Sequence, residues 1–106
     1  MLPDSKIALL IGSQVPGIFF PAEQQISKVI STFASYTGRM IRYEHLNEVK
    51  RCFTMAGVLY KNGSNALRNA IEGAFIFTLS PLINKQHQAM LPLSLRHIRL
   101  QQLQTI

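Results

Sequence analysis

The sequence is short of cysteine and of acidic residues, and both shortages limit what the protein can be. Cys52 is the only cysteine, so no disulfide can form within the chain, which is typical of a reducing compartment. Five Asp and Glu stand against eleven Lys and Arg, and charged residues make up only 15% of the chain, where about a quarter is usual. This low share of charge indicates that a partner, most simply a second copy of the protein, covers part of the surface.

Long hydrophobic runs are absent as well. The apolar run near the N-terminus, from Ile7 to Ile11, has five residues and ends at Gly12. A secretory signal needs about seven to fifteen apolar residues, and a membrane-spanning helix needs about twenty. We therefore expect a cytoplasmic protein with no membrane span.

The apolar residues that are present suffice for one core. Hydrophobic residues make up 47% of the 106 residues, which suits a globular domain and argues against disorder. We expect residues 1–106 to form a single domain. The net charge is +6, and no acidic residue follows Glu72. A uniformly basic last third could favour an acidic protein, a nucleic acid or an anionic membrane surface, although ordinary solubility also explains it.

The first forty residues predict two helices. One is expected over residues 3–14, with a strand over residues 6–12 as the alternative, because the apolar run there is too short for its period to be read. The second is expected from Pro21 to Gly38. Proline suits the first turn of a helix, and glycine is a natural C-terminal stop.

The third and fourth predicted helices, over residues 43–62 and 65–83, carry the clearest helical period. The apolar positions of the third are Leu46, Val49, Phe53, Ala56 and Tyr60. Those of the fourth include Leu67, Ile71, Phe75 and Leu79. Because both apolar seams are long and continuous, we expect an antiparallel helical hairpin at about 43–83 to form the centre of the fold.

The turn of this hairpin lies at Asn62, Gly63 and Ser64. Asn-Gly is also typical of a turn between two β-strands, which would require apolar and polar residues to alternate on both sides. The flanking segments keep the helical period instead. We therefore expect Gly63 to cap the third helix in the left-handed conformation and Ser64 to be the N-cap of the fourth.

The remainder of the chain predicts a connector and one more helix. Pro81 should distort or end the fourth helix, because it lacks an N–H donor. A polar connector is expected over residues 84–89 and a fifth helix from about Pro92. The inward positions of this last helix are Leu95, Ile98 and Leu103, and the outward ones are Arg96, Arg99 and Gln102. The sequence thus predicts an all-α fold, a compact bundle of four to five helices.

No motif for nucleotide binding is present. The segment from Gly12 to Gly17 has glycines spaced as in a phosphate-binding loop, but Ile18 stands where that loop requires lysine. Pro16 also removes one of the backbone donors that would contact a phosphate. We expect neither a nucleotide nor a small-molecule substrate.

The residues that most often carry catalysis or bind metals are few and dispersed. No two of Cys52, His45, His87 and His97 have the spacing of a metal-binding pair. We expect His45 to hydrogen-bond to Glu48 one turn later, and His87 and His97 to lie on the surface. Cys52 lies beside an apolar seam, which predicts a buried and inert thiol. The sequence therefore predicts no enzyme, no metal and no cofactor.

Because the sequence predicts neither catalysis nor a metal site, we expect a function in binding another macromolecule. Arg68, Asn69 and Glu72 share one face of the fourth helix, and such side chains can bond base edges. A DNA-binding regulator of the helix-turn-helix type is the alternative, although its helices are shorter and cross at about 90–120°. Apolar residues beyond the needs of the core favour protein–protein interaction or self-association. We predict a non-enzymatic binding module with these contact residues: Arg68, Asn69, Glu72, Arg96 and Arg99.

The hairpin also carries a family resemblance. The segments Leu59 to Gly63, Arg68 to Glu72 and Phe75 to Leu79 resemble small all-helical bacterial domains with no assigned activity. The resemblance covers residues 43–83 and implies an all-α fold. It supplies no catalytic residue.

Overall fold

The computed structural model describes residues 3–20 and 25–104, and the ordered elements of these ranges are all helical. The α-helices are α1 (Ile7–Gln14), α2 (Ile26–Arg42), α3 (Leu46–Asn62), α4 (Asn65–Ala70), α5 (Lys85–Met90) and α6 (Leu93–Gln104). A π-helical segment, η2 (Ile71–Phe77), continues α4, and 3₁₀ turns form η1 (Asp4–Lys6) and η3 (Ser80–Leu82). The predicted all-α fold is confirmed, and the segment at residues 6–12 is a helix and not a strand.

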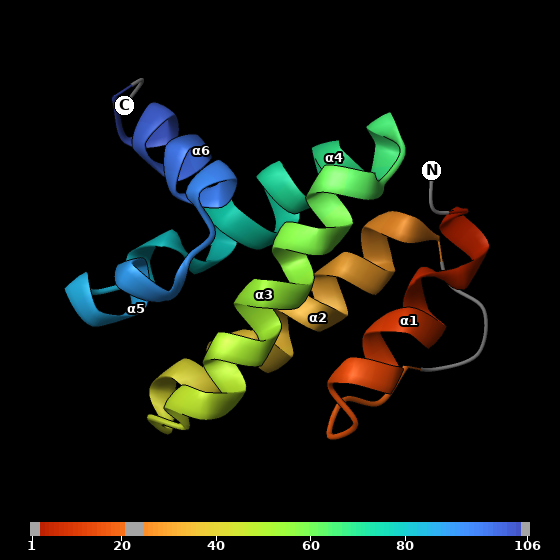
Figure 1. The fold of residues 1–106 in the computed structure, drawn as a ribbon, viewed down its shortest axis with the longest axis horizontal. Helices are drawn as coiled ribbons and strands as arrows, with labels where there is room; N and C mark the ends of the chain where they lie inside the picture. The colour runs from red at the N-terminus through yellow and green to blue at the C-terminus, as the bar shows by residue number, and fades with distance from the viewer. Residues whose placement is uncertain (1–2, 21–24, 105–106) are drawn as a thin grey trace.

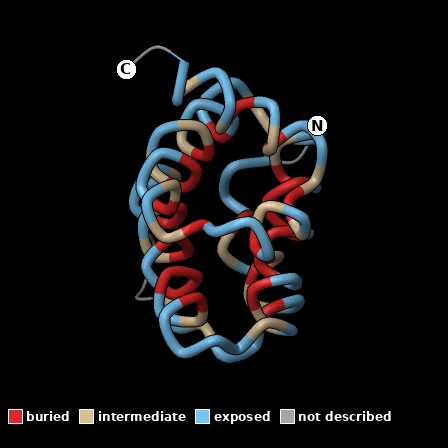
Figure 2. The backbone as a smooth tube through the Cα atoms, turned by 90° about the vertical axis from the view of Figure 1, so that its left-hand side faces the viewer, coloured by how far each residue is buried: buried red, intermediate tan, exposed pale blue. Residues whose placement is uncertain are grey.

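The helices are arranged around α2 and α3, which lie side by side in the middle of the molecule (Figure 1). The arm formed by α4 and η2 packs on α2, and α1 lies on one side of the central pair while α5 and α6 lie on the other. The whole measures 34 × 28 × 19 Å. In Figure 2 the buried residues line the inward faces of the helices and the exposed ones their outer faces.

Three phenylalanine rings at the centre of the core join three elements. Phe33 of α2, Phe53 of α3 and Phe75 of η2 are fully buried. The centroid of the Phe75 ring lies 4.9 Å from that of Phe33 and 6.4 Å from that of Phe53. These separations and the tilted and edge-on orientations are favourable for aromatic pairs. The apolar seams predicted for the central helices therefore meet at one point.

The second arm of the hairpin winds more widely than predicted. From Ile71 to Phe77 the backbone is π-helical, with hydrogen bonds between residues five apart. Its buried residues Ile71 and Ile76 have this same separation. The wider winding keeps both side chains in the core, whereas the sequence predicted a regular α-helix.

Gly38 does not end α2, which was predicted to stop there and instead continues to Arg42. A Cβ atom on this glycine would lie 3.4 Å from Leu79 and 3.5 Å from Leu82. The glycine is therefore placed where α2 packs closely on the segment after η2. The predicted start of this helix at Pro21 lies outside the described residues.

The turn between α3 and α4 is in the predicted place, but Gly63 has a different conformation. Its backbone is extended, with φ −93° and ψ 171°, and not left-handed. A Cβ atom here would come within 2.6 Å of the Leu59 carbonyl oxygen, so lack of space excludes a side chain. Ser64 is the N-cap as predicted, since its Oγ accepts the Leu67 N–H at 3.2 Å.

The predicted polar connector over residues 84–89 is wrong, because this segment forms α5. Asn84 Oδ1 accepts the backbone N–H of His87 at 3.0 Å, and His87 Nδ1 accepts that of Asn84 at 3.2 Å. Such a reciprocal cap usually involves glutamate or glutamine, so histidine in this role gave no signal. His87 is consequently buried and not on the surface.

Two further side chains differ from their predicted places. His45 makes no hydrogen bond with Glu48, and its ring instead meets the ring of Tyr43 edge-on, with centroids 6.2 Å apart. Leu103 was predicted to face inward, but it is 47% exposed. Leu95 and Ile98 of the same helix are buried as predicted.

We expect Phe75→Ala to lower the free energy of unfolding by about 3–5 kcal/mol, because it empties the point where three helices meet. Phe77→Ala is the matched control, since Phe77 lies two residues away and is 61% exposed. Its effect should stay within about 0.5 kcal/mol. Denaturant unfolding followed by circular dichroism measures both, and equal losses would contradict the central position of Phe75.

Candidate interaction groove

Helices α1 and α3 enclose a groove on the surface of the protein, with a volume of about 940 Å³. From α1 and the turn after it, the lining residues are Leu10, Ser13, Gln14 and Pro16. From α3 they are Asn47, Lys50, Arg51, Thr54, Met55 and Val58. The α3 residues form one band along the helix, because positions three and four apart share a face.

The two helices run in opposite directions along the groove (Figure 1). Asp4 lies just before α1 and Ser64 just after α3, and the Ser64 hydroxyl donates a hydrogen bond of 2.7 Å to Asp4 Oδ1. This bond holds the start of α1 beside the end of α3. The end of α1 consequently lies toward the start of α3.

Basic side chains stand at both ends of the groove. Lys50 and Arg51 line its half near the start of α3. Lys6 immediately precedes α1, and Lys61 lies in the last turn of α3, so both lie beyond the opposite end of the groove without lining it. All four are exposed. Within the described ranges no ion pair joins any two residues, so none of the acidic side chains in residues 3–20 and 25–104 pairs with these cations.

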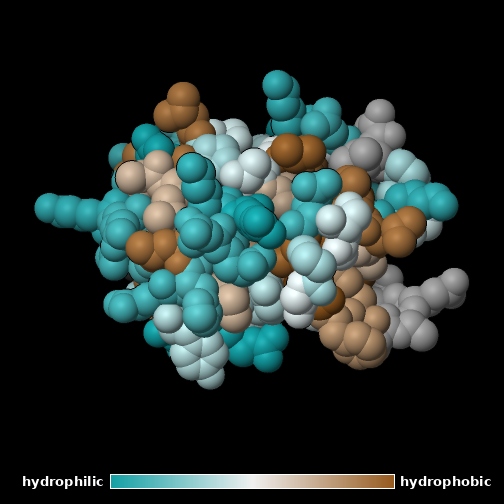
Figure 3. All heavy atoms as spheres, turned by 60° about the horizontal axis from the view of Figure 1, so that its bottom comes forward, coloured by the Kyte–Doolittle hydropathy of each residue, from teal (hydrophilic) through white to brown (hydrophobic). Residues whose placement is uncertain are grey.

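Between these cations the groove carries an apolar strip, beside the polar side chains of Thr54 and Ser13. Met55 is buried in its floor, and Val58, which is 44% exposed, stands beside it. Leu10 faces them from α1. Figure 3 shows apolar side chains gathered over α1 and the segment after it. Leu9 and Phe19, from this part of the chain, are 71% and 79% exposed.

The predicted contact face of the fourth helix is partly occupied by contacts within the protein. The Arg68 guanidinium lies over the ring of Tyr60, 4.7 Å from its centroid. The Tyr60 hydroxyl donates a hydrogen bond of 2.8 Å to Glu72 Oε2, and Glu72 is half-buried. Asn69 is exposed. Tyr60 thus links Arg68 and Glu72, and this face joins the two arms of the hairpin.

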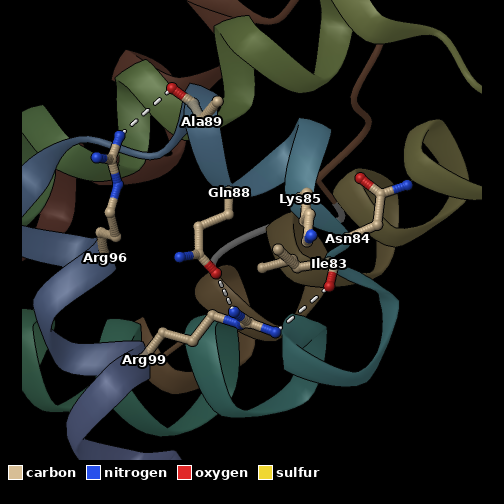
Figure 4. Close-up of a pocket in the computed structure, with 7 residues that line it drawn as sticks. All are labelled: Ile83, Asn84, Lys85, Gln88, Ala89, Arg96 and Arg99. Carbon is tan, nitrogen blue, oxygen red and sulfur yellow. Dashed lines mark hydrogen bonds between the residues drawn. The ribbon is translucent and has the colours of Figure 1, made fainter.

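Arg99 was predicted to point outward, but its guanidinium is half-buried in a smaller pocket of about 530 Å³ (Figure 4). Its Nε donates to Ser80 Oγ at 3.0 Å, and its Nη1 donates to Gln88 Oε1. Its Nη2 donates to the carbonyl oxygens of Ser80 and Ile83, both at 3.3 Å. Arg99 therefore joins α6 to η3 and α5.

Arg96 was also predicted to point outward, and it too is half-buried. Its Nη2 donates to the carbonyl oxygens of Leu91 at 3.0 Å and of Ala89 at 3.4 Å (Figure 4). It therefore satisfies carbonyl groups at the end of α5, a role in which basic side chains are common. None of the five predicted contact residues lines the groove between α1 and α3.

Cys52 is fully buried, which confirms its predicted position. Burial raises the pKa of its thiol to about 11, and the nearby Glu48 carboxylate also raises it, while Thr37 acts in the opposite direction. A thiol with this pKa stays protonated at neutral pH, and the thiolate is the nucleophilic form. The side chain is therefore inert in the folded protein.

In residues 3–20 and 25–104 no three His, Cys, Asp or Glu side chains come together as ligands for a metal ion. No helix there combines the length and the apolar content that are needed to cross a membrane.

Comparison with known proteins places the chain in a family. A family model with the description Domain of unknown function (DUF7674) matches residues 9–105. The chain belongs to this family. No curated protein and no solved structure matches it. The resemblance found over residues 43–83, to domains without an assigned activity, thus extends over the DUF7674 domain from α1 to α6, which includes the groove.

The sequence contains a signal for the groove that the prediction did not use. Lys50 and Arg51 precede Thr54 by four and three residues, and Val58 follows it by four, so these side chains share a face of the third helix that does not contain Phe53. This band is polar and basic at one end and apolar at the other. Its pairing with α1 depends on a contact between residues sixty positions apart, which no local pattern indicates.

We expect Arg99→Ala to lower the free energy of unfolding by about 1.5–3 kcal/mol, because it leaves half-buried acceptors without their charged donor. Lys85→Ala is the control, since Lys85 lines the same pocket and makes no hydrogen bond through its side chain. Thermal melting compares the two. If Arg99→Ala melts like the parent, Arg99 does not hold these elements together.

Cys52 should resist alkylation by iodoacetamide at pH 9 in the folded protein and react readily in guanidinium, where its pKa returns to about 8.5. Mass spectrometry of the labelled protein measures both rates. As pH rises from about 9 to 11, the unfolded thiol loses its proton and the folded one keeps it, so the free energy of unfolding should fall. Equal labelling in both states would contradict the burial of Cys52.

Proposed function

We propose that this DUF7674 domain is a non-enzymatic, cytoplasmic module that binds another protein through the groove between α1 and α3. The observation that carries the proposal is the composition of the groove. An apolar strip formed by Leu10, Met55 and Val58 lies beside Lys50 and Arg51, which have no acidic partner among the described residues. Apolar surface bordered by polar groups is typical of a binding site.

The energetics favour a macromolecular partner. Fully burying a large apolar side chain contributes roughly 1.5–3 kcal/mol, and Leu9, Phe19 and Val58 together expose much of theirs. Association also costs several kcal/mol in lost freedom of motion. A partner that covers only the groove gains little binding free energy beyond this cost. A partner that also covers Leu9 and Phe19 gains enough free energy to bind specifically.

The proposal that the protein is not an enzyme is supported by Cys52. It is the only thiol in the chain, and burial keeps it protonated. The close acidic pair lies away from the apolar part of the groove, with Glu44 in the connection before α3 and Glu48 in the first turn of α3. Neither this acidic pair nor the Cys52 thiol lines the groove.

The two alternatives have weaker support. In self-association through this groove, two copies that each have a net charge of +6 would meet with Lys50 and Arg51 on both sides, and like charges oppose close approach. In DNA binding through the fourth helix, Glu72 would face the phosphates, and Arg68 would have to leave the ring of Tyr60. Binding of a different protein requires neither the approach of two like-charged copies nor the displacement of Arg68 from Tyr60.

The test is affinity capture from the native cell with three forms of the protein: the parent, Val58→Glu and Leu93→Glu. Val58 lines the groove, whereas Leu93 is an equally suitable control because it is exposed on α6, on the opposite side of the molecule. We expect the parent and Leu93→Glu to capture the same protein and Val58→Glu to lose it.

Two measurements accompany this capture. Light scattering should give a monomer for the parent, and labelled duplex DNA should show no shift in a gel at low salt. Capture of identical proteins by all three forms would refute the groove as the binding site. A dimer that Val58→Glu dissociates, or DNA retardation that Arg68→Ala removes, would establish self-association or DNA binding in its place.

A further inference from the structure

We propose that the groove between α1 and α3 takes an acidic amphipathic α-helix of the partner protein. This inference rests on the proposed function and specifies its ligand. Three properties of the groove carry it: its shape, the position of its cations, and the apolar strip between them.

The shape of the groove suits a helix. Its walls are two antiparallel helices, and the trough between two such helices is where a third helix packs in a bundle. The band on α3 runs from Asn47 to Val58. At 1.5 Å per residue this band is about 16 Å long, which corresponds to three turns of a helix. An amphipathic helix in an apolar groove is a recurring mode of recognition.

The basic side chains around the groove specify that the bound helix carries negative charge. Lys50 and Arg51 line the half of the groove near the start of α3, and Lys6 and Lys61 lie beyond its other end, before α1 and in the last turn of α3. Among the residues that the structure describes, no carboxylate lines the groove and none of these four cations has an ion pair. Glutamates or aspartates at the two ends of a bound helix would therefore meet cations at both. Complementary charge of this kind gives orientation and specificity.

The apolar strip favours an acidic helix over other anionic ligands, such as a nucleic acid. Binding to a nucleic acid comes mainly from cations that contact phosphates, and that gives no role to Leu10, Met55 and Val58 at the centre of the groove. A helix with apolar residues at i, i+3, i+4 and i+7 uses both features, because its apolar face covers the strip while its acidic flanks reach the cations.

The probe is a synthetic helical peptide of about four turns, with leucines along one face and glutamates beside that face and at both ends. Two matched peptides are the controls. One replaces every glutamate with lysine, and the other has the same composition in an order that breaks the leucine face. Fluorescence anisotropy measures binding to the intact protein, and amide chemical shifts map the site.

We expect the acidic peptide to bind with shifts confined to α1 and α3, and both control peptides to bind at least tenfold more weakly. Arg51→Glu should weaken the acidic peptide at least tenfold, and added salt should weaken it further. Lys85→Glu is the matched variant, because it makes the same change of charge on α5 and should leave binding unchanged. Both positions are exposed, and thermal melting verifies that both variants fold.

The inference fails if the acidic and basic peptides bind alike, if the shifts lie outside α1 and α3, or if Arg51→Glu and Lys85→Glu have the same effect. It also fails if the peptide does not bind while duplex DNA or anionic vesicles bind in a way that Arg51→Glu removes. Failure with the peptide, combined with capture that depends on Val58, would refute the helical ligand alone. Failure of both experiments would refute the proposed function as well.

Discussion

The contact between Phe33, Phe53 and Phe75 is the constraint on which the rest of the structure depends. Each ring comes from a different element, so the contact holds α2, α3 and η2 at once. It also determines which side of α3 faces inward. With Phe53 in the core, the band from Asn47 to Val58 faces α1 and the solvent. The position of the groove therefore follows from the packing of the core on the other side of the same helix.

Much of the fold could be predicted because it follows from periodicity, which is a local property of the sequence. The third helix and the cap at Ser64 are confirmed for this reason. Gly38 and Gly63 were misinterpreted because glycine has two uses. At Gly63 the sequence indicates only that a side chain is absent, whereas the packed structure shows that the Leu59 carbonyl group leaves no room for one. His87 was misplaced since its cap with Asn84 uses an uncommon residue.

The candidate site was harder to predict than the fold, because it depends on contacts between distant segments. Arg96 and Arg99 were chosen for their charge, but their donors are directed to carbonyl groups of other elements, which charge alone does not reveal. Conversely, Lys50 and Arg51 were not among the predicted contact residues. They line a groove only because α1 lies beside α3, a packing that no local pattern of the sequence indicates.

The hydrogen bond between Ser64 and Asp4 also bears on the order in which the protein is completed. It joins residues that are sixty positions apart, and closing so long a loop costs more entropy than forming the local contacts of the hairpin. The wall of the groove that α1 forms is therefore in place only after residues sixty positions apart have come together. A ligand that needs both walls recognises the finished fold and not a partly folded chain in which only the hairpin has formed.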